Sequence, residues 1–112
     1  MKNIICYVDG ENKANLTHFK PYNNVRYLVF LGKNQKDKIK AEQGVKLKKI
    51  RCESDEKQFL DCKLIEYFLT RKNSKDTIHY IVSEDSGYDK YISYVNALNG
   101  DISCRIKNFD NF

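Results

Sequence analysis

Short apolar runs alternate with amphipathic stretches along the whole chain. Five runs are continuously or alternately apolar, as β-strands are: 3–8, 25–31, 45–52, 77–83 and 102–106. Four intervening stretches have a helical pattern: about 12–20, 34–43, 57–71 and 87–98. Strands that alternate with helices form a parallel sheet with helices on both faces. The pattern therefore predicts an α/β fold, a three-layer α/β/α sandwich around a five-stranded parallel sheet.

The stretch 57–71 has the clearest helical pattern. Apolar pairs recur in it at three-to-four spacing and form one stripe: Phe59 and Leu60, Leu64 and Ile65, Phe68 and Leu69. Asp55 with Gln58, and Ser86 with Asp89, have the spacing of capping pairs. These pairs predict where the third and fourth helices begin.

Length and composition are those of one globular domain, residues 1–112. Hydrophobic residues make up 41% of the chain and charged residues 31%, which is ordinary for a soluble protein. No apolar run approaches the roughly 20 residues of a membrane span, and Asp9 interrupts the apolar start before a secretory signal could form. We therefore expect a cytoplasmic protein that does not bind a membrane.

The cysteines and histidines do not have metal-ligand spacing. There are four cysteines and two histidines: Cys6, Cys52, Cys62, Cys104, His18 and His79. Three of the cysteines lie in strand-like runs, where a thiol behaves as a small buried hydrophobe: Cys6, Cys52 and Cys104. We therefore expect reduced cysteines and neither a zinc site nor a structural disulfide.

Acidic residues follow the first and fourth predicted strands. In an open parallel sheet the functional crevice lies beyond the carboxyl ends of the strands, where the strand order reverses. The first strand leads into residues 9–12 and the fourth into residues 83–89, and both segments contain aspartates. Asp61 borders the apolar stripe of the third helix. Converging carboxylates repel one another and favour a divalent cation, which can activate water for attack on a phosphate.

Each acid also has a purely structural explanation. Asp9 with Gly10 can form a turn, Asp85 can cap a helix, and Asp89 can belong to a capping pair. Asp61 can favour the positive end of its helix. The occurrence of all these acids at the expected strand ends favours a joint site over a set of independent caps.

Three segments of the chain contain short motifs with a fixed order of residues. Residues 7–12 (YVDGEN) are similar to a V/L-D-x-E-N opening, and residues 57–61 (KQFLD) to a K-N-x-L-D helix start. Residues 81–89 (IVSEDSGYD) are similar to an I-S-x-D-x-G-F/Y-D signature. In these motifs the chain resembles the PIN-like domains, in particular their small bacterial branch, and the resemblance covers essentially the whole chain. Gln58 replaces the usual asparagine and Gly10 replaces a bulkier apolar residue, which affects substrate positioning more than metal binding.

The resemblance implies a sheet of order 3-2-1-4-5 and a Mg²⁺- or Mn²⁺-dependent endoribonuclease. It implies four metal-binding catalytic acids: Asp9, Asp61, Asp85 and Asp89. It also implies supporting polar residues that orient them: Asn12, Ser83 and Glu11. The resemblance implies RNA as the substrate, with single-stranded RNA as one candidate. It also implies an inhibitor protein or a second copy of the chain as a partner.

Basic residues crowd the region from Lys33 to Arg51, and the net charge of the chain is +5. Four of them are candidates for binding nucleic acid through its phosphates: Lys46, Lys48, Lys49 and Arg51. Lysines at a sheet edge also block strand pairing, so this alternative stays open. Two other functions stay open as well: a catalytically inactive PIN-fold module that binds nucleic acid or protein, and a hydrolase of small nucleotides.

Overall fold

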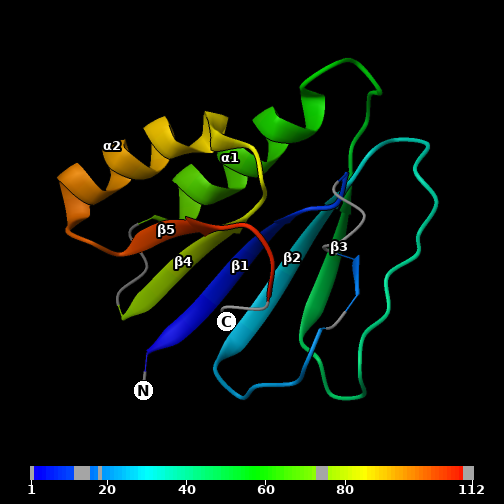
Figure 1. The fold of residues 1–112 in the computed structure, drawn as a ribbon, viewed down its shortest axis with the longest axis horizontal. Coiled ribbons are helices and arrows are strands. Elements are labelled where there is room, and N and C mark those ends of the chain that lie inside the picture. The colour runs from blue at the N-terminus through cyan, green and yellow to red at the C-terminus, as the bar shows by residue number, and fades with distance from the viewer. Residues whose placement is uncertain (1, 12–15, 18, 73–75, 110–112) are drawn as a thin grey trace.

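The computed structural model describes residues 2–11, 16–17, 19–72 and 76–109 (Figure 1). Five parallel strands form one sheet: β1 (Asn3–Asp9), β2 (Val25–Leu31), β3 (Leu47–Arg51), β4 (Thr77–Val82) and β5 (Ser103–Ile106). Their order is β3-β2-β1-β4-β5. The predicted α/β fold and strand order are therefore confirmed. The order reverses beside β1, whose neighbours are β2 and β4.

The central strand β1 is apolar from Ile4 to Val8 because both of its faces are covered. Tyr7 packs into the core beneath the helices, whereas Cys6 and Val8 pack into the core on the opposite face. Such burial on two sides produces a continuous apolar run instead of an alternating one. Val8 lies opposite Val29 of β2 and Val82 of β4, so the three strands end at nearly the same level.

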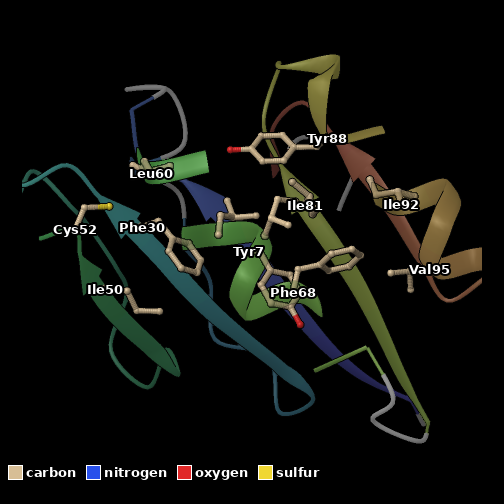
Figure 2. Packing of buried hydrophobic residues seen from close by; sticks show 12 residues of the cluster. Tyr7, Phe30, Ile50, Cys52, Leu60, Phe68, Ile81, Tyr88, Ile92 and Val95 are labelled. Atoms are coloured by element: carbon tan, nitrogen blue, oxygen red, sulfur yellow. The ribbon is translucent and has the colours of Figure 1, made fainter. Parts of the chain in front are cut away.

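Two helices, α1 (Phe59–Arg71) and α2 (Asp89–Asn99), lie on the same face of the sheet. Helix α1 packs over β1 and β2, and α2 packs beside β5. A short 3₁₀ helix, η2 (Ser86–Tyr88), leads into α2. The apolar stripe predicted for α1 supplies its buried residues: Leu60, Leu64, Ile65 and Phe68. These side chains pack against Tyr7 and Phe30 of the sheet (Figure 2).

The predicted helix starts need correction. Gln58, and not Asp55, occupies the N-cap position of α1, with a left-handed backbone (φ 68°) and no side-chain cap. At the second start, Asp85 caps η2 by accepting a hydrogen bond from the Gly87 amide, whereas Ser86 already lies inside η2. The N-cap of the helical segment after β4 is thus Asp85, one residue before Ser86, which the Ser86–Asp89 spacing predicts as the cap.

The helix predicted at 34–43 is wrong, because this segment is irregular chain. Ile39 is its single large apolar residue, so a helix there would have no stripe to bury. Ile39 instead packs on the second face of the sheet, and Ala41 forms a parallel bridge with Phe19. Among the described residues no α-helix covers this face, while most of the helix predicted at 12–20 lies outside the described residues.

All four cysteines are free thiols. Cys6 and Cys52 are buried, as predicted, but Cys104 is exposed. Cys104 lies opposite Tyr80 of β4, which faces away from the helices, and the described chain leaves Cys104 exposed on this face of the outer strand β5. No helix in the described part of the chain has the length and apolar character needed to cross a bilayer.

Candidate active site

Asp9 ends β1 on the face of the sheet that α1 covers. It follows Tyr7 by two residues, and side chains two apart in a strand point to the same face. Asp9 is only 8% exposed. Its Oδ2 accepts a hydrogen bond from the Ser83 hydroxyl (3.0 Å), and its Oδ1 accepts one from the Glu11 amide (3.1 Å). These two donors orient the carboxylate at the carboxyl edge of the sheet.

Ser83 joins the ends of β1 and β4. While its hydroxyl donates to Asp9, the same oxygen accepts a hydrogen bond from the Asp85 amide (3.1 Å). The Oδ1 of Asp85 in turn accepts from the Gly87 amide (2.8 Å). Asp85 is therefore a helix cap, as its structural explanation predicts, and it also lies beside Asp9. The two explanations of this residue are compatible.

Asp61 enters the same region from the first turn of α1. Its Oδ1 accepts a hydrogen bond from the Tyr88 hydroxyl (2.9 Å). The Tyr88 ring is 2% exposed and packs in the core, and its hydroxyl points toward the start of α1, where Leu60 lies (Figure 2). Burial and the neighbouring carboxylates raise the pKa of Tyr88, so it stays a donor at neutral pH. Tyr88 thus links η2 to α1 and fixes Asp61.

The carboxylates at this edge act on one another electrostatically. Burial raises the pKa of Asp9, and the charges of Asp61 and Asp85 raise it further, against the lowering effect of its two hydrogen bonds. Burial and the charges of Asp9 and Asp61 likewise raise the pKa of Glu11. Among the described residues, no basic side chain forms a salt bridge with Asp9, Asp61 or Asp85. The structure therefore brings these acids together without a salt bridge to any described basic side chain, although the charge of Asp85 helps to raise the pKa of Arg105.

Asp89, the fourth predicted acid, has a different environment. Arg105 of β5 donates to both of its carboxylate oxygens, from Nε (2.7 Å) and from Nη2 (3.3 Å). This pairing lowers the pKa of Asp89. Arg105 also donates from Nη1 to the Ser83 carbonyl (3.1 Å). Asp89 therefore holds Arg105, which in turn contacts the end of β4. Arg105 is the one charged residue of β5, and this isolated charge is the sequence feature from which such a role could have been predicted.

The turn after β1 depends on a glycine. The Gly10 amide donates to the Phe30 carbonyl (2.9 Å), and a Cβ at Gly10 would lie 2.3 Å from that carbonyl oxygen. Real Cβ atoms do not approach backbone so closely, so a larger residue would have to displace the turn. The close contact between β1 and β2 thus favours glycine at position 10.

Gln35, which the sequence analysis does not predict as a site residue, forms hydrogen bonds to the same turn. Its Nε2 donates to the Gly10 carbonyl (2.6 Å), and its Oε1 accepts from the Gly32 amide (2.9 Å). Arg51 Nη1 donates to the Gly32 and Gln35 carbonyls. These contacts hold the loop after β2 against the loop that carries Glu11. Asn12, the other predicted supporting residue, lies outside the described residues.

The four predicted nucleic-acid-binding residues do not form one surface beside the acids. Lys46 precedes β3 at the amino edge of the sheet and donates to the Asn23 carbonyl. Lys49 pairs with Asp37 of the irregular loop, on the face of β3 that also carries Arg51. Lys48 alternates to the opposite face and is exposed. Of the four, Arg51 lies nearest the carboxyl edge, and its guanidinium is engaged in holding the loop after β2.

Two clefts flank the acids. One, of about 450 Å³, lies between α1 and the segment from Asp85 to Tyr91, and Asp61 and Asp85 line it. The other, of about 360 Å³, lies beyond the ends of β2 and β3, and Glu11 lines it. Both fall in the size range of small-molecule sites, about 300–1,000 Å³. The carboxyl edge is therefore hollowed on both sides of the acids.

The acids form a donor set that suits a hard divalent cation bound partly through water. No group of three or more His, Cys, Asp or Glu side chains within the described ranges is arranged to hold a metal ion directly. Mg²⁺ typically keeps several waters and takes one or two carboxylates plus substrate phosphates. Asp9 and Asp85 each supply oxygens with a free lone pair, and a cation would offset the mutual repulsion that raises the pKa of Asp9.

Comparisons with known proteins do not add to this picture. No protein-family model, curated protein or solved structure matches the chain. The functional assignment therefore depends on the motifs and on the geometry of the acids.

Proposed function

We propose that this protein is a Mg²⁺- or Mn²⁺-dependent endoribonuclease. One observation supports the proposal most. Asp9, Asp61 and Asp85 come from three separate segments and share one carboxyl edge, and their charges act on one another without a salt bridge in the described residues. Holding like charges together opposes folding, so such an arrangement is expected where a cation is to be bound.

The chain's own residues orient the acids for this role. The Ser83 hydroxyl and the Glu11 amide hold Asp9, and the Tyr88 hydroxyl holds Asp61, as outer hydrogen bonds orient metal ligands in other sites. A bound ion would supply charge stabilisation at a phosphate oxygen and lower the pKa of an attacking water. In this proposal Asp89 acts through Arg105 as a positioning residue.

RNA is the substrate that the combined observations favour. A phosphodiester bears the negative charge that a carboxylate-held divalent cation attracts. The three segments that resemble PIN-like domains carry the proposed acids, and that family acts mostly on RNA. The net charge of +5 is compatible with a polyanionic substrate.

The test is cleavage of matched single-stranded RNA and DNA with Mn²⁺, with Mg²⁺ or with a chelator. We expect metal-dependent cleavage of RNA that Asp61→Asn and Asp85→Asn each reduce about 100-fold or more. Asp101→Asn is the matched control, because Asp101 is exposed and lies between α2 and β5 at the amino edge of the sheet. Cleavage that survives chelation, or that Asp85→Asn leaves unchanged, would overturn the proposal. Absence of cleavage with any metal would favour the inactive binding module.

A further inference from the structure

The cleft between α1 and α2 combines an apolar floor with polar groups at its rim. Ile65 and Tyr88 belong to the buried core and line the cleft together with the half-buried Tyr91. Asp61 and Asp85 lie at the end nearest the proposed site of phosphate cleavage. This composition, apolar walls with a few polar groups, is that of sites for small organic groups.

Two polar side chains at the rim have no partner among the described residues. Gln58 and Glu66 both line the cleft, and neither the Gln58 amide nor the Glu66 carboxylate makes a side-chain hydrogen bond or ion pair there. Gln58 has a left-handed backbone (φ 68°), a conformation that is uncommon for residues other than glycine. Two unpaired groups over an apolar floor are available to a ligand.

The charge of the cleft selects the part of a nucleotide that fits it. Three carboxylates line it against one ammonium, that of Lys90, so a phosphate group would be repelled. A nucleobase is uncharged, and its flat face can stack on a tyrosine ring. The Lys90 Nζ lies over one face of the Tyr91 ring, 5.2 Å from its centre, so a base that stacks on this face displaces the ammonium group.

The Glu66 carboxylate sets a preference among bases. An ionised carboxylate only accepts hydrogen bonds, and the exocyclic amino group of cytosine is a donor that Glu and Asp side chains accept from. Uracil has a carbonyl oxygen at the same ring position, which would face the carboxylate without a hydrogen bond.

We propose that this cleft is a nucleobase subsite that takes an unpaired, amino-bearing base next to the scissile phosphate. The base stacks on Tyr91, and Glu66 and Gln58 contact its edge. The inference rests on the proposed nuclease function for the position of the phosphate and for RNA as the source of the base.

Uncharged nucleosides test the subsite separately from catalysis. We expect cytidine, titrated into the chelated protein and followed by amide chemical shifts, to bind about tenfold more tightly than uridine, as one charge-assisted hydrogen bond provides. Glu66→Gln should abolish that preference, because the neutral amide offers both a donor and an acceptor. Glu66 is exposed, so this variant does not disturb the core.

The aromatic contact has a matched control on the same helix. Tyr91→Leu should weaken cytidine and uridine binding at least about fivefold, the lower end for loss of one base–aromatic stack. Tyr94→Leu should leave both affinities unchanged, because Tyr94 is 57% exposed and lies outside the cleft. Thermal melting of both variants verifies that they are folded.

The outcomes separate the subsite from the nuclease proposal. Equal binding of cytidine and uridine to the wild type, no binding of either, or equal losses in Tyr91→Leu and Tyr94→Leu would overturn the subsite even if RNA is cleaved. Conversely, a cytidine preference that depends on Glu66 and Tyr91 would support the subsite even if no metal-dependent cleavage is found, since nucleosides carry no phosphate and the chelator removes the metal.

Discussion

The acidic edge and the basic strand of this protein are both strongly charged, but their charges are handled differently. At the acidic edge, Asp9 and Asp61 accept hydrogen bonds from hydroxyl groups and, in the described residues, have no cationic partner. On the basic side, Lys49 pairs with Asp37 and Arg51 donates to two backbone carbonyls.

This difference distinguishes charges that have no salt bridge in the described residues from charges that the chain pairs internally. A buried or half-buried carboxylate without a counter-ion costs stability, which is why we propose that this edge binds an external cation. A basic side chain that is already satisfied within the chain contributes to the fold and has less capacity left for a ligand. By the same criterion Asp89, paired with Arg105, resembles the basic strand more than the other acids.

The strongest test of the comparison is the response of stability to metal. Wild type should gain about 2.7 kcal/mol when free Mn²⁺ exceeds its Kd about 100-fold, because only the folded protein binds it. Asp61→Asn and Asp85→Asn should gain much less, whereas Asp89→Asn should gain as much as wild type. Without metal the first two variants should be at least as stable as wild type. Thermal melting with Mn²⁺ and with chelator measures these gains.

Equal metal-induced gains in all four proteins would show that the acids bind no ion. A loss of the gain in Asp89→Asn equal to that in Asp61→Asn would place Asp89 with the metal-binding acids, as the resemblance implies.

The turn that carries the acidic edge should be sensitive to one methyl group. Gly10→Ala should lower the free energy of unfolding by about 1–3 kcal/mol, as overpacking does, because its Cβ would meet the Phe30 carbonyl at 2.3 Å. Gly32→Ala is the control, since a Cβ there contacts only the Gln35 side chain, at 3.6 Å. Urea unfolding measures both. Similar losses in the two variants would refute the close-contact explanation.

Arg51 and Lys48 should differ although both are exposed basic residues of β3. Arg51→Ala removes two hydrogen bonds to loop carbonyls and should cost about 1–2 kcal/mol of stability. Lys48→Ala should stay within about 0.5 kcal/mol of wild type, as surface substitutions usually do. Urea unfolding at constant salt compares them. A larger loss in Lys48→Ala would contradict the structural role assigned to Arg51.

The smallest expected effect is a difference in pH dependence between Asp9 and Asp89. Burial and neighbouring carboxylates raise the pKa of Asp9 above 3.8, so ionised Asp9 costs stability, and this cost is relieved as the pH falls through the raised pKa. Arg105 lowers the pKa of Asp89 below 3.8, so its stabilisation is present above 3.8 and is lost as the pH falls through the lowered pKa.

Asp9→Asn should therefore change the pH profile of stability above pH 3.8, and Asp89→Asn should change it below. Urea unfolding of the metal-free proteins from about pH 3 to about pH 7 separates the two windows. Profiles that differ from wild type in the same window would show that the two aspartates do not have opposite environments.

The elements that bury continuous apolar surface can be predicted from the amino-acid sequence alone. The strands β1 and β2 and the helix α1 match the predicted runs closely. Their buried faces require apolar residues at regular spacing, and this spacing is recognisable in the sequence. The acids at the ends of β1 and β4 could be placed at one edge, since parallel strands end at the same side of a sheet. The strand order itself came from the family resemblance.

The roles of the polar residues depend on contacts that form in the folded protein. Residues 34–43 have helix-forming composition but a single large apolar residue, Ile39, so packing on the sheet outweighed local preference. The partners of Asp89, Lys49 and Arg51 are 12 or more residues away in the chain. Hydrogen bonds and ion pairs leave no periodic trace in the sequence, and the same aspartate can be a cap, a metal ligand or half of an ion pair. The three-dimensional contacts of its carboxylate distinguish these roles.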